Sequence, residues 1–193
     1  VASPVNHDMM VGHPWLSNLL LYDKRAILSS QGGLLRFIRQ LRSVSYDLAV
    51  VPATVSVSLT SGLIARLSGA TVRIGPGRLE HRDNASKFLF THPVDLDWSR
   101  TPARHQSLRN ADIMAPLGLE CAEGPYLLSV LPDEDAHAAR LLDPLRSDHP
   151  RIFGIHPGAA KPGNRWPVEH FAQLAYLLHA EYRNGLVVTL GPK

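Results

Sequence analysis

Apolar runs alternate with helical patterns along the first 75 residues of the chain. The runs, each bounded by polar or turn residues, are NLLLYD (18–23), DLAVVPAT (47–54) and TVRIG (71–75). Runs of this length are typical of buried strands. Between them, apolar side chains recur at helical spacing in two segments, which contain Leu34, Leu35, Ile38 and Leu41 and then Leu59, Leu63, Ile64 and Leu67. This alternation predicts an α/β fold in which helices cover the faces of a parallel sheet.

The middle of the chain has a weaker pattern. Residues 76–104 are charged and contain prolines, so we expect a loop with at most one short strand, KFLFTH (87–92). A helical pattern resumes over residues 105–117. A further helix is predicted within residues 131–150, beginning near Asp133 and ending before the Ser-Asp-His-Pro punctuation.

A second β-α-β pattern fills the last part of the chain. It consists of a strand RIFGIH (151–156), a helical face over residues 168–182 and a strand GLVVTLG (185–191). We therefore divide the chain into a domain of residues 1–147 and a second of residues 148–193. Two strands and one helix cannot bury themselves, since open α/β sheets usually have about five or six strands. The unit either docks on the first sheet or, as we expect, begins a second domain that the sequence does not complete.

Composition narrows the class of protein. The chain is 45% hydrophobic and lacks a run of about 18 apolar residues, so we predict a globular protein without a transmembrane helix. Its first residues lack the features of a signal peptide, and its single cysteine, Cys121, cannot form an internal disulfide. A cytoplasmic setting is then the simpler assumption. The formal charge of +3 favours anionic partners, and nucleic acid, phospholipid and nucleotide sugar all fit it.

The loop at residues 157–167 has the chemistry of an anion site. It connects a strand to a helix, which is where ligands bind in doubly wound α/β folds. Gly158 allows the backbone to approach a ligand closely, and a helix starting at Pro167 directs free amide groups toward the loop. The small and basic residues of the loop are Gly158, Ala159, Ala160, Lys161 and Arg165. The loop has neither a P-loop nor a dinucleotide-binding pattern. Two interpretations therefore stay open, a phosphate-binding loop and an ordinary strand-to-helix connection without a ligand.

Polar residues of the first domain have both functional and structural interpretations. Arg36, Arg39 and Arg42 lie opposite an apolar stripe, where they either meet an anionic saccharide or membrane or form a solvated face. Ser56 and Ser58 precede a predicted helix, where their hydroxyl groups either cap backbone amides or contact an acceptor.

Two rings near the loop also leave alternatives open. His156 ends a strand and either contacts a ligand or caps a turn, and Trp166 either stacks on a base or sugar or packs beneath the loop. The ten histidines include no pair at i, i+4 spacing and no cysteine-containing zinc pattern, so no metal site is predicted.

The segment HPGAAKPGNRWPVEHFAQLAYLL (156–178) resembles the start of the C-terminal domain in the ADP-heptose:lipopolysaccharide heptosyltransferases, glycosyltransferase family 9. In that family a strand ends in Pro-Gly-Ala, and a basic loop leads to Arg-Trp-Pro-x-Glu-x-Phe. Three earlier segments are similar to successive segments of the family's first domain, namely HPWLSNLLLYD (13–23), YDLAVVPATVSVSLTSGLIARLSGATVRIG (46–75) and RHQSLRNADIMAPLGLE (104–120).

The resemblance implies a GT-B architecture of two Rossmann-like domains, of which the chain holds the first, incomplete at its start, and the beginning of the second. It implies inverting, metal-independent transfer of a sugar, a heptose, from a nucleotide-diphosphate donor such as ADP-heptose, with no cofactor. The implied acceptor is a lipopolysaccharide core or another anionic or lipid-linked glycan, rather than nucleic acid. The implied location is the cytoplasm, with peripheral association at the inner face of the inner membrane left open. Arg36, Ser56 and Ser58 become candidates for the acceptor side.

The chain also departs from the family pattern. Asn164 stands where the family commonly has a lysine near the donor phosphates, so Arg165 or Lys161 takes over that contact, or binding is weaker. No catalytic residue is assigned within the chain, because the family's Gly-Asp segment, with its catalytic aspartate, is expected before Val1. A donor-binding Asp-x-Gly-x-x-His segment is expected after Lys193. The alternative function is a non-catalytic nucleotide- or saccharide-binding module derived from a GT-B enzyme.

Overall fold

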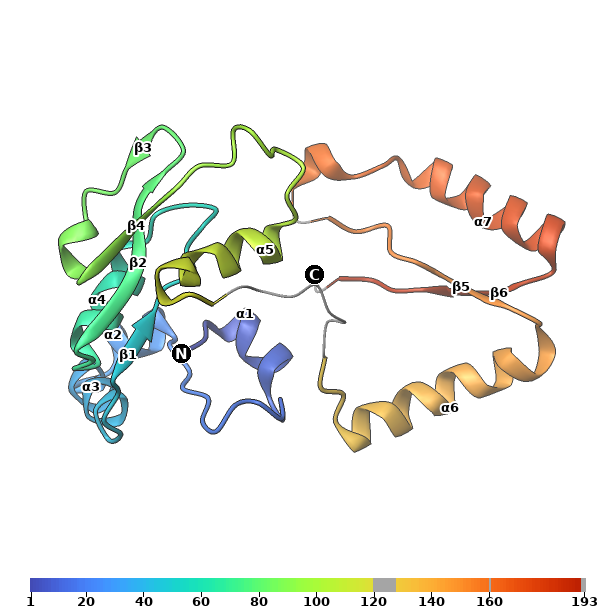
Figure 1. Cartoon of the computed structure of the whole chain (residues 1–193). Coiled ribbons are helices and arrows are strands. Elements are labelled where there is room, and N and C mark those ends of the chain that lie inside the picture. Colours follow the sequence, from blue (N-terminus) through green and yellow to red (C-terminus); the bar gives the residue numbers. More distant parts are fainter. Residues whose placement is uncertain (120–127, 160, 192–193) are drawn as a thin grey trace. The chain divides into compact units, whose positions relative to one another are not determined.

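The structure is a computed structural model that describes residues 1–119, 128–159 and 161–191 (Figure 1). It divides into two compact units, Val1–Ser129 and Val130–Lys193. The division precedes α6 (Pro132–Asp148), because this helix packs against a strand of the second unit. The boundary between the units and the domain boundary predicted after residue 147 therefore differ by one helix.

The first unit contains short helices and a small sheet. Its helices are α1 (Pro4–His7), α2 (Lys24–Ser29), α3 (Gly33–Leu41), α4 (Leu59–Leu67) and α5 (Gln106–Ala111), with 3₁₀ turns η1 (Asp8–Met10), η2 (Lys87–Leu89) and η3 (Asp112–Leu117). Its strands are β1 (Leu48–Val50), β2 (Val72–Leu79), β3 (Arg82–Asp83) and β4 (His92–Leu96). β2 pairs in parallel with β1 and β4 and antiparallel with β3. The predicted α/β fold with a parallel sheet is confirmed.

The prediction of a loop over residues 76–104 is wrong for its first part, which belongs to β2. β2 continues through Pro76, where a shift of its register against β4 accommodates a proline that has no N–H for the ladder. The predicted strand at residues 87–92 is also wrong, because most of it turns back on itself. The amides of Lys87 and Leu89 donate to the carbonyls of Asn84 and Ser86, and β4 begins only at His92.

The strand predicted at residues 18–23 is reduced to one isolated parallel bridge between Ala2 and Leu21. The amide of Ala2 donates to the carbonyl of Leu20 at 2.9 Å, and the amide of Tyr22 donates to the carbonyl of Ala2 at 2.8 Å. A strand requires such bonds along its length, and the bridge supplies them at one position only. The prediction of a strand over these six residues is therefore wrong.

Helices α3 and α4 occur where the sequence predicts them, but the face that each helix buries differs from the predicted leucine-rich face. α3 buries Gly33, Phe37 and Leu41, whereas Leu34 and Leu35 are exposed. α4 buries Gly62 and Ala65 and leaves the leucines at 59 and 63 exposed. A Cβ added to residue 62 would lie 2.9 Å from a methyl group of the leucine at 89, so a small residue is needed for this close approach.

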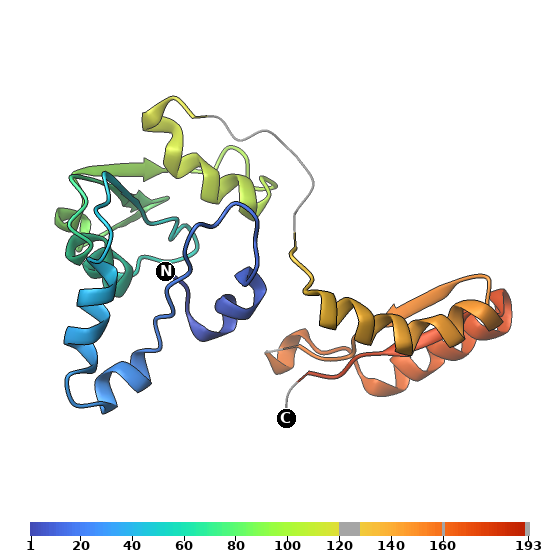
Figure 2. The ribbon, with the colours of Figure 1, turned by 90° about the horizontal axis from the view of Figure 1, so that it is seen from below.

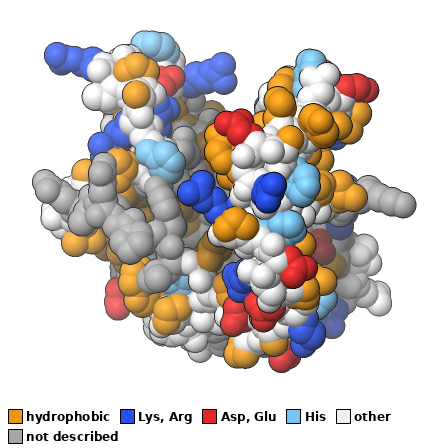
Figure 3. All heavy atoms as spheres, turned by 90° about the vertical axis from the view of Figure 1, so that its right-hand side faces the viewer, with side chains coloured by type: hydrophobic (Ala, Val, Ile, Leu, Met, Phe, Trp, Pro, Cys, Tyr) orange, Lys and Arg blue, Asp and Glu red, His pale blue; other side chains and the backbone are white. Residues whose placement is uncertain are grey.

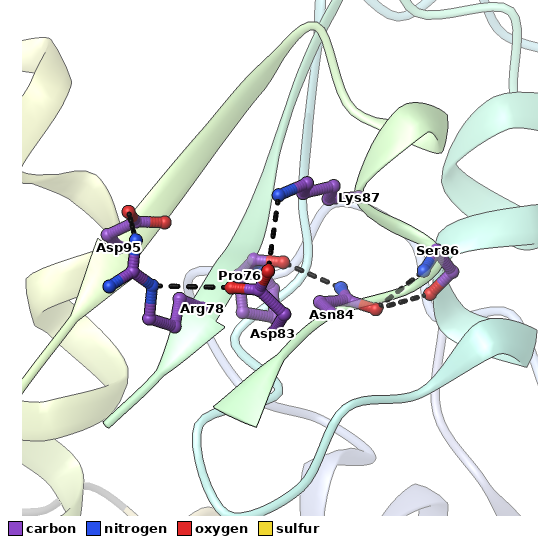
Figure 4. A network of polar contacts seen from close by, with 7 residues as sticks. All are labelled: Pro76, Arg78, Asp83, Asn84, Ser86, Lys87 and Asp95. Carbon is purple, nitrogen blue, oxygen red and sulfur yellow. Dashed lines mark hydrogen bonds and ion pairs between the residues drawn. The ribbon is translucent and has the colours of Figure 1, made fainter. Parts of the chain in front are cut away.

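Beside the β2–β3 hairpin, polar side chains form a network that Figure 4 shows. Asn84, only 2% exposed, donates through Nδ2 to the carbonyl of Pro76 at 2.6 Å. Its Oδ1 accepts from the amide and the hydroxyl group of Ser86, at 2.9 and 2.6 Å. Outside this buried part, Arg78 pairs with Asp83 and with the aspartate at 95, at 3.3 Å each. The buried amide therefore fixes the hairpin against the turn that follows it.

The largest buried cluster of the first unit lies where β2 and β4 meet η3, and it contains Ile74, Leu79, Leu96, Trp98 and Ile113. Trp98 donates its indole N–H to Oδ2 of Asp112 at 2.8 Å, and Arg104 pairs with the same carboxylate through two nitrogens. The hydrogen bonds from Arg104, with a smaller contribution from Trp98, hold the pKa of Asp112 below its usual value of 3.8. This ion pair links the segment after β4 to η3.

The second unit is a two-stranded parallel sheet between two helices. It contains α6, β5 (Ile152–Ile155), the 3₁₀ turn η4 (Pro162–Asn164), α7 (Val168–Tyr182) and β6 (Gly185–Val188). α6 and α7 lie on opposite faces of the sheet, as the two ribbon views show (Figures 1 and 2). The predicted β-α-β pattern is present, with both strands ending sooner than expected.

Many apolar side chains of this unit remain at the surface, and Figure 3 shows hydrophobic side chains in orange among charged ones on the face that it draws. α6 and α7 bury no residue fully, and Tyr176 and Leu177 of α7 are 73% and 59% exposed. Within the described ranges, no helix has both the length and the apolar character needed to cross a membrane.

Candidate functional site

The carboxyl ends of β5 and β6 lie at one edge of the second unit's sheet, because the two strands are parallel. His156 follows β5 and Thr189 follows β6, and the ring Nδ1 of the histidine lies 2.9 Å from the threonine hydroxyl oxygen. The sequence left two roles open for His156, a ligand contact or a turn cap. The structure adds a third role, a hydrogen bond that connects the ends of the two strands. Thr189 was missed by sequence reasoning. Its position after a parallel strand was the only signal for it.

Gly158 lies directly against this histidine. A Cβ added at residue 158 would lie 2.9 Å from Nε2 of His156, which is closer than ordinary contact. The backbone at Gly158 does not have a positive φ, so close approach rather than left-handed geometry explains the glycine here. The ring therefore lies between the loop backbone on one side and Thr189 on the other.

Arg165 closes the loop on itself. Its Nε donates to the carbonyl of Ala159 at 2.9 Å, across six residues. The side chain is exposed, and within the described part of the chain its terminal guanidinium nitrogens make no hydrogen bond or ion pair. Such an arginine can present a planar pair of N–H groups to a phosphate while its Nε holds the loop.

The remaining predicted donor-side residues surround this arginine. Lys161 directly precedes η4 and Asn164 is its last residue, and both are exposed. The amide of Asn164 donates to the carbonyl of Lys161 at 3.0 Å, whereas its side chain makes no hydrogen bond with the described residues. Ala160 lies outside the described residues. The predicted set therefore remains a prediction, of which the structure joins Ala159 and Arg165 directly.

Trp166 packs on the first turn of α7 rather than beneath the loop. Its ring centroid lies 5.0 Å from that of His170 and 5.1 Å from that of Phe171, and the residue is 48% exposed. α7 begins after Pro167 without a side-chain cap on its first amides. Among the described residues, the amides of Val168 and Glu169 therefore have no hydrogen-bond partner, and they lie close in sequence to Arg165.

The acceptor-side candidates of the first unit differ in their surroundings. Ser58 caps α4 by accepting a hydrogen bond from the amide of Ser61 at 3.2 Å, and it lines a cavity of about 1070 Å³. Ser56 and Arg36 are exposed and are not among the residues that line this cavity. For Ser58, the structure therefore supports the capping interpretation.

A polar cluster in the loop after β1 was missed by sequence reasoning. Thr54 is 6% exposed, and its hydroxyl group bonds with Oδ1 of Asn110 in α5. Gln106 donates to the threonine hydroxyl at 2.7 Å and to Oδ1 of Asn110 at 3.0 Å. These contacts anchor α5 to the loop that follows β1. In the described ranges, no three His, Cys, Asp or Glu side chains are grouped in a way that could hold a metal ion.

Comparison with known protein families gives a match over most of the chain. The model of glycosyltransferase family 9 (heptosyltransferase) matches residues 34–192. The chain belongs to glycosyltransferase family 9. Among solved structures, this family member is similar to the E. coli heptosyltransferase WaaC with ADP-2-deoxy-2-fluoro heptose, with a TM-score of 0.53 and 18% identity. None of the curated proteins matches it.

The similarity to WaaC covers 88% of this chain and 50% of the WaaC chain, so this member of the family spans about half the length of that enzyme. At this identity the likeness concerns the fold. The fold is of the GT-B type, as the resemblance implied, and the loop with Gly158 and Arg165 lies within the matched range.

Proposed function

We propose that the chain is part of a glycosyltransferase that transfers a heptose from a nucleotide-diphosphate donor to a lipopolysaccharide core or another glycan. Membership of glycosyltransferase family 9 supports the reaction class. The presence of ADP-2-deoxy-2-fluoro heptose with the structurally similar WaaC supports an ADP-heptose-like donor. We also propose that the acceptor is anionic or lipid-linked and that the reaction takes place in the cytoplasm, at the inner face of the inner membrane.

The arrangement of Arg165 is the observation that carries this proposal. Its Nε is held by the carbonyl of Ala159, and its terminal nitrogens make no hydrogen bond or ion pair with the described residues. Lys161 adds a second cation, and the first amides of α7 have no side-chain cap. A diphosphate develops negative charge as it leaves the sugar, and preorganised cations and amides stabilise that charge.

We propose that the transfer is inverting, as the family resemblance implies, and that these cations allow it to proceed without a metal ion. The acceptor hydroxyl group would displace the diphosphate in one step from the opposite face of the sugar, while Arg165 and Lys161 neutralise the leaving group. The hydroxyl proton would pass to a general base. The family resemblance implies an aspartate in this role, which we assign to no residue of this chain.

Calorimetry with an ADP-heptose donor on the full-length protein tests the role of Arg165. A charge-assisted hydrogen bond is worth about 1.5–3 kcal/mol, so Arg165→Ala should weaken donor binding at least about tenfold. Arg165→Lys keeps the charge but loses the bond to Ala159, and should have an intermediate effect. Arg140→Ala, an exposed arginine of α6, is the matched control. An unchanged donor dissociation constant for Arg165→Ala would rule out this role.

The same measurement resolves the departure at Asn164. Asn164→Lys adds a cation in the exposed turn before Arg165, and we expect several-fold tighter donor binding, as for an exposed charge contact. Saturable donor binding by the full-length protein without sugar transfer to any glycan acceptor would favour the alternative, a non-catalytic binding module.

A further inference from the structure

Helices α2 and α3 form a hairpin with an unusual charge pattern. Residues 24–46 contain no aspartate or glutamate and include the cations Lys24, Arg25, Arg36, Arg39 and Arg42. The turn between the helices is tight, because a Cβ added to Gly33 would lie 2.1 Å from Oγ of Ser30 and 2.4 Å from the carbonyl of Ile27. The hairpin therefore carries charge of one sign on two helices that are closely packed at their turn.

Large apolar side chains lie exposed among these cations. Leu28 of α2 is 64% exposed and Leu35 of α3 is 69% exposed. On α3 the buried face is formed by Gly33, Phe37 and Leu41, so Leu35 and Arg39, four residues apart, share the opposite face. The sequence pattern predicts a buried Leu35. The structure instead places this leucine beside the arginines.

We define the α2–α3 patch as the exposed cations of this hairpin together with its two most exposed leucines, namely Lys24, Arg25, Leu28, Leu35, Arg36 and Arg39. Arg42 is excluded because its Nε donates to the carbonyl of Leu67 at 2.8 Å and so links α3 to α4. An ordinary solvated helix face carries charged and polar side chains. The patch instead combines large exposed leucines with charges of one sign.

We propose that the α2–α3 patch docks on an anionic lipid bilayer. Leucines on such a surface enter the boundary between headgroups and acyl chains, while lysines and arginines meet the anionic headgroups. The absence of acidic residues between Lys24 and Tyr46 gives the charge complementarity that this partner requires. The docking rests on the proposed function only for its purpose, which is to bring the enzyme to a lipid-linked acceptor.

Co-sedimentation with vesicles tests the proposal on the whole chain. We expect binding to vesicles of phosphatidylglycerol and phosphatidylcholine, much weaker binding to pure phosphatidylcholine, and a decrease as salt is added. Each basic residue near such a surface changes the partition coefficient about fivefold, so Arg39→Gln should reduce it by about that factor. Leu35→Gln removes an apolar contact without changing the charge, and should also reduce binding several-fold.

Two variants on α6 serve as matched controls. Leu141, 62% exposed, and Arg140, also exposed, repeat the same residue types on a helix whose first turn is acidic. Leu141→Gln and Arg140→Gln should bind vesicles like the unmodified chain. Equal losses in the α6 and α2–α3 variants, or no binding of the unmodified chain to anionic vesicles, would overturn the proposal.

The pair of substitutions also identifies a different partner. If Arg39→Gln weakens binding and Leu35→Gln does not, the patch contacts a polyanion through charge alone, and the lipid proposal is refuted. Donor calorimetry on the full-length protein with the same substitutions separates this inference from the proposed function. Absent donor binding together with intact vesicle binding contradicts the function alone, whereas normal donor binding without vesicle binding contradicts the docking alone.

Discussion

Replacing Gly158 by alanine probes the contact between the loop and His156. The new Cβ would lie 2.9 Å from Nε2 of His156, about 0.5 Å short of the ordinary contact distance of 3.4 Å. The ring must therefore move, and the movement stretches the 2.9 Å bond between its Nδ1 and the hydroxyl group of Thr189. A neutral hydrogen bond contributes about 0.5–1.5 kcal/mol, so we expect donor binding to weaken about two- to tenfold.

Donor calorimetry on the full-length protein measures this effect, and the loop offers a matched control. A Cβ at Gly163 meets nothing within 4 Å, so Gly163→Ala should leave the dissociation constant unchanged. Thr189→Val removes the same hydrogen bond without bulk in the loop, and its effect should not add to that of Gly158→Ala. Normal donor binding by Gly158→Ala, or equal weakening by Gly163→Ala, would refute the reasoning.

Two further predictions concern the first unit. Asn84→Ala removes a side chain that is 2% exposed and makes three hydrogen bonds, so the free energy of unfolding should fall by about 3 kcal/mol. Urea denaturation followed by tryptophan fluorescence measures this, and a loss below about 1 kcal/mol contradicts it. The hydrogen bonds from Arg104 and Trp98 lower the pKa of Asp112 in the folded state. The ionised Asp112 therefore stabilises the fold fully above the unfolded-state pKa of 3.8. This stabilisation is lost as the pH falls through the lower folded-state pKa. Asp112→Asn should therefore flatten the decrease in stability below about pH 4, and an unchanged slope in acid denaturation contradicts this assignment.

The elements that sequence predicts well are those with local causes. α7 occupies the predicted residues 168–182, and α3 covers the predicted stripe. The helical hydrogen bonds of both segments join residues four apart, so periodicity and flanking residues suffice to locate them. β4 and the segment 18–23 were predicted wrongly, because a strand depends on a partner that is distant in the sequence.

The candidate site divides in the same way. Gly158 and Arg165 were recognised from the small and basic residues between a strand and a helix, a pattern contained in one stretch of sequence. Thr189 was not recognised, because it reaches His156 only when two strands 33 residues apart in sequence end side by side. The cluster of Thr54 with Asn110 spans 56 residues and was missed for the same reason.

The sequence by itself determined the α/β class, the positions of most helices, and the family resemblance carried by the loop before Trp166. Only the tertiary structure decided which face of each helix is buried. Periodicity gives the spacing of apolar residues, but burial also depends on what the helix packs against, and α3 packs with Phe37 and Leu41 inward. Leu35 is exposed beside Arg39 for that physical reason, and the α2–α3 patch follows from it.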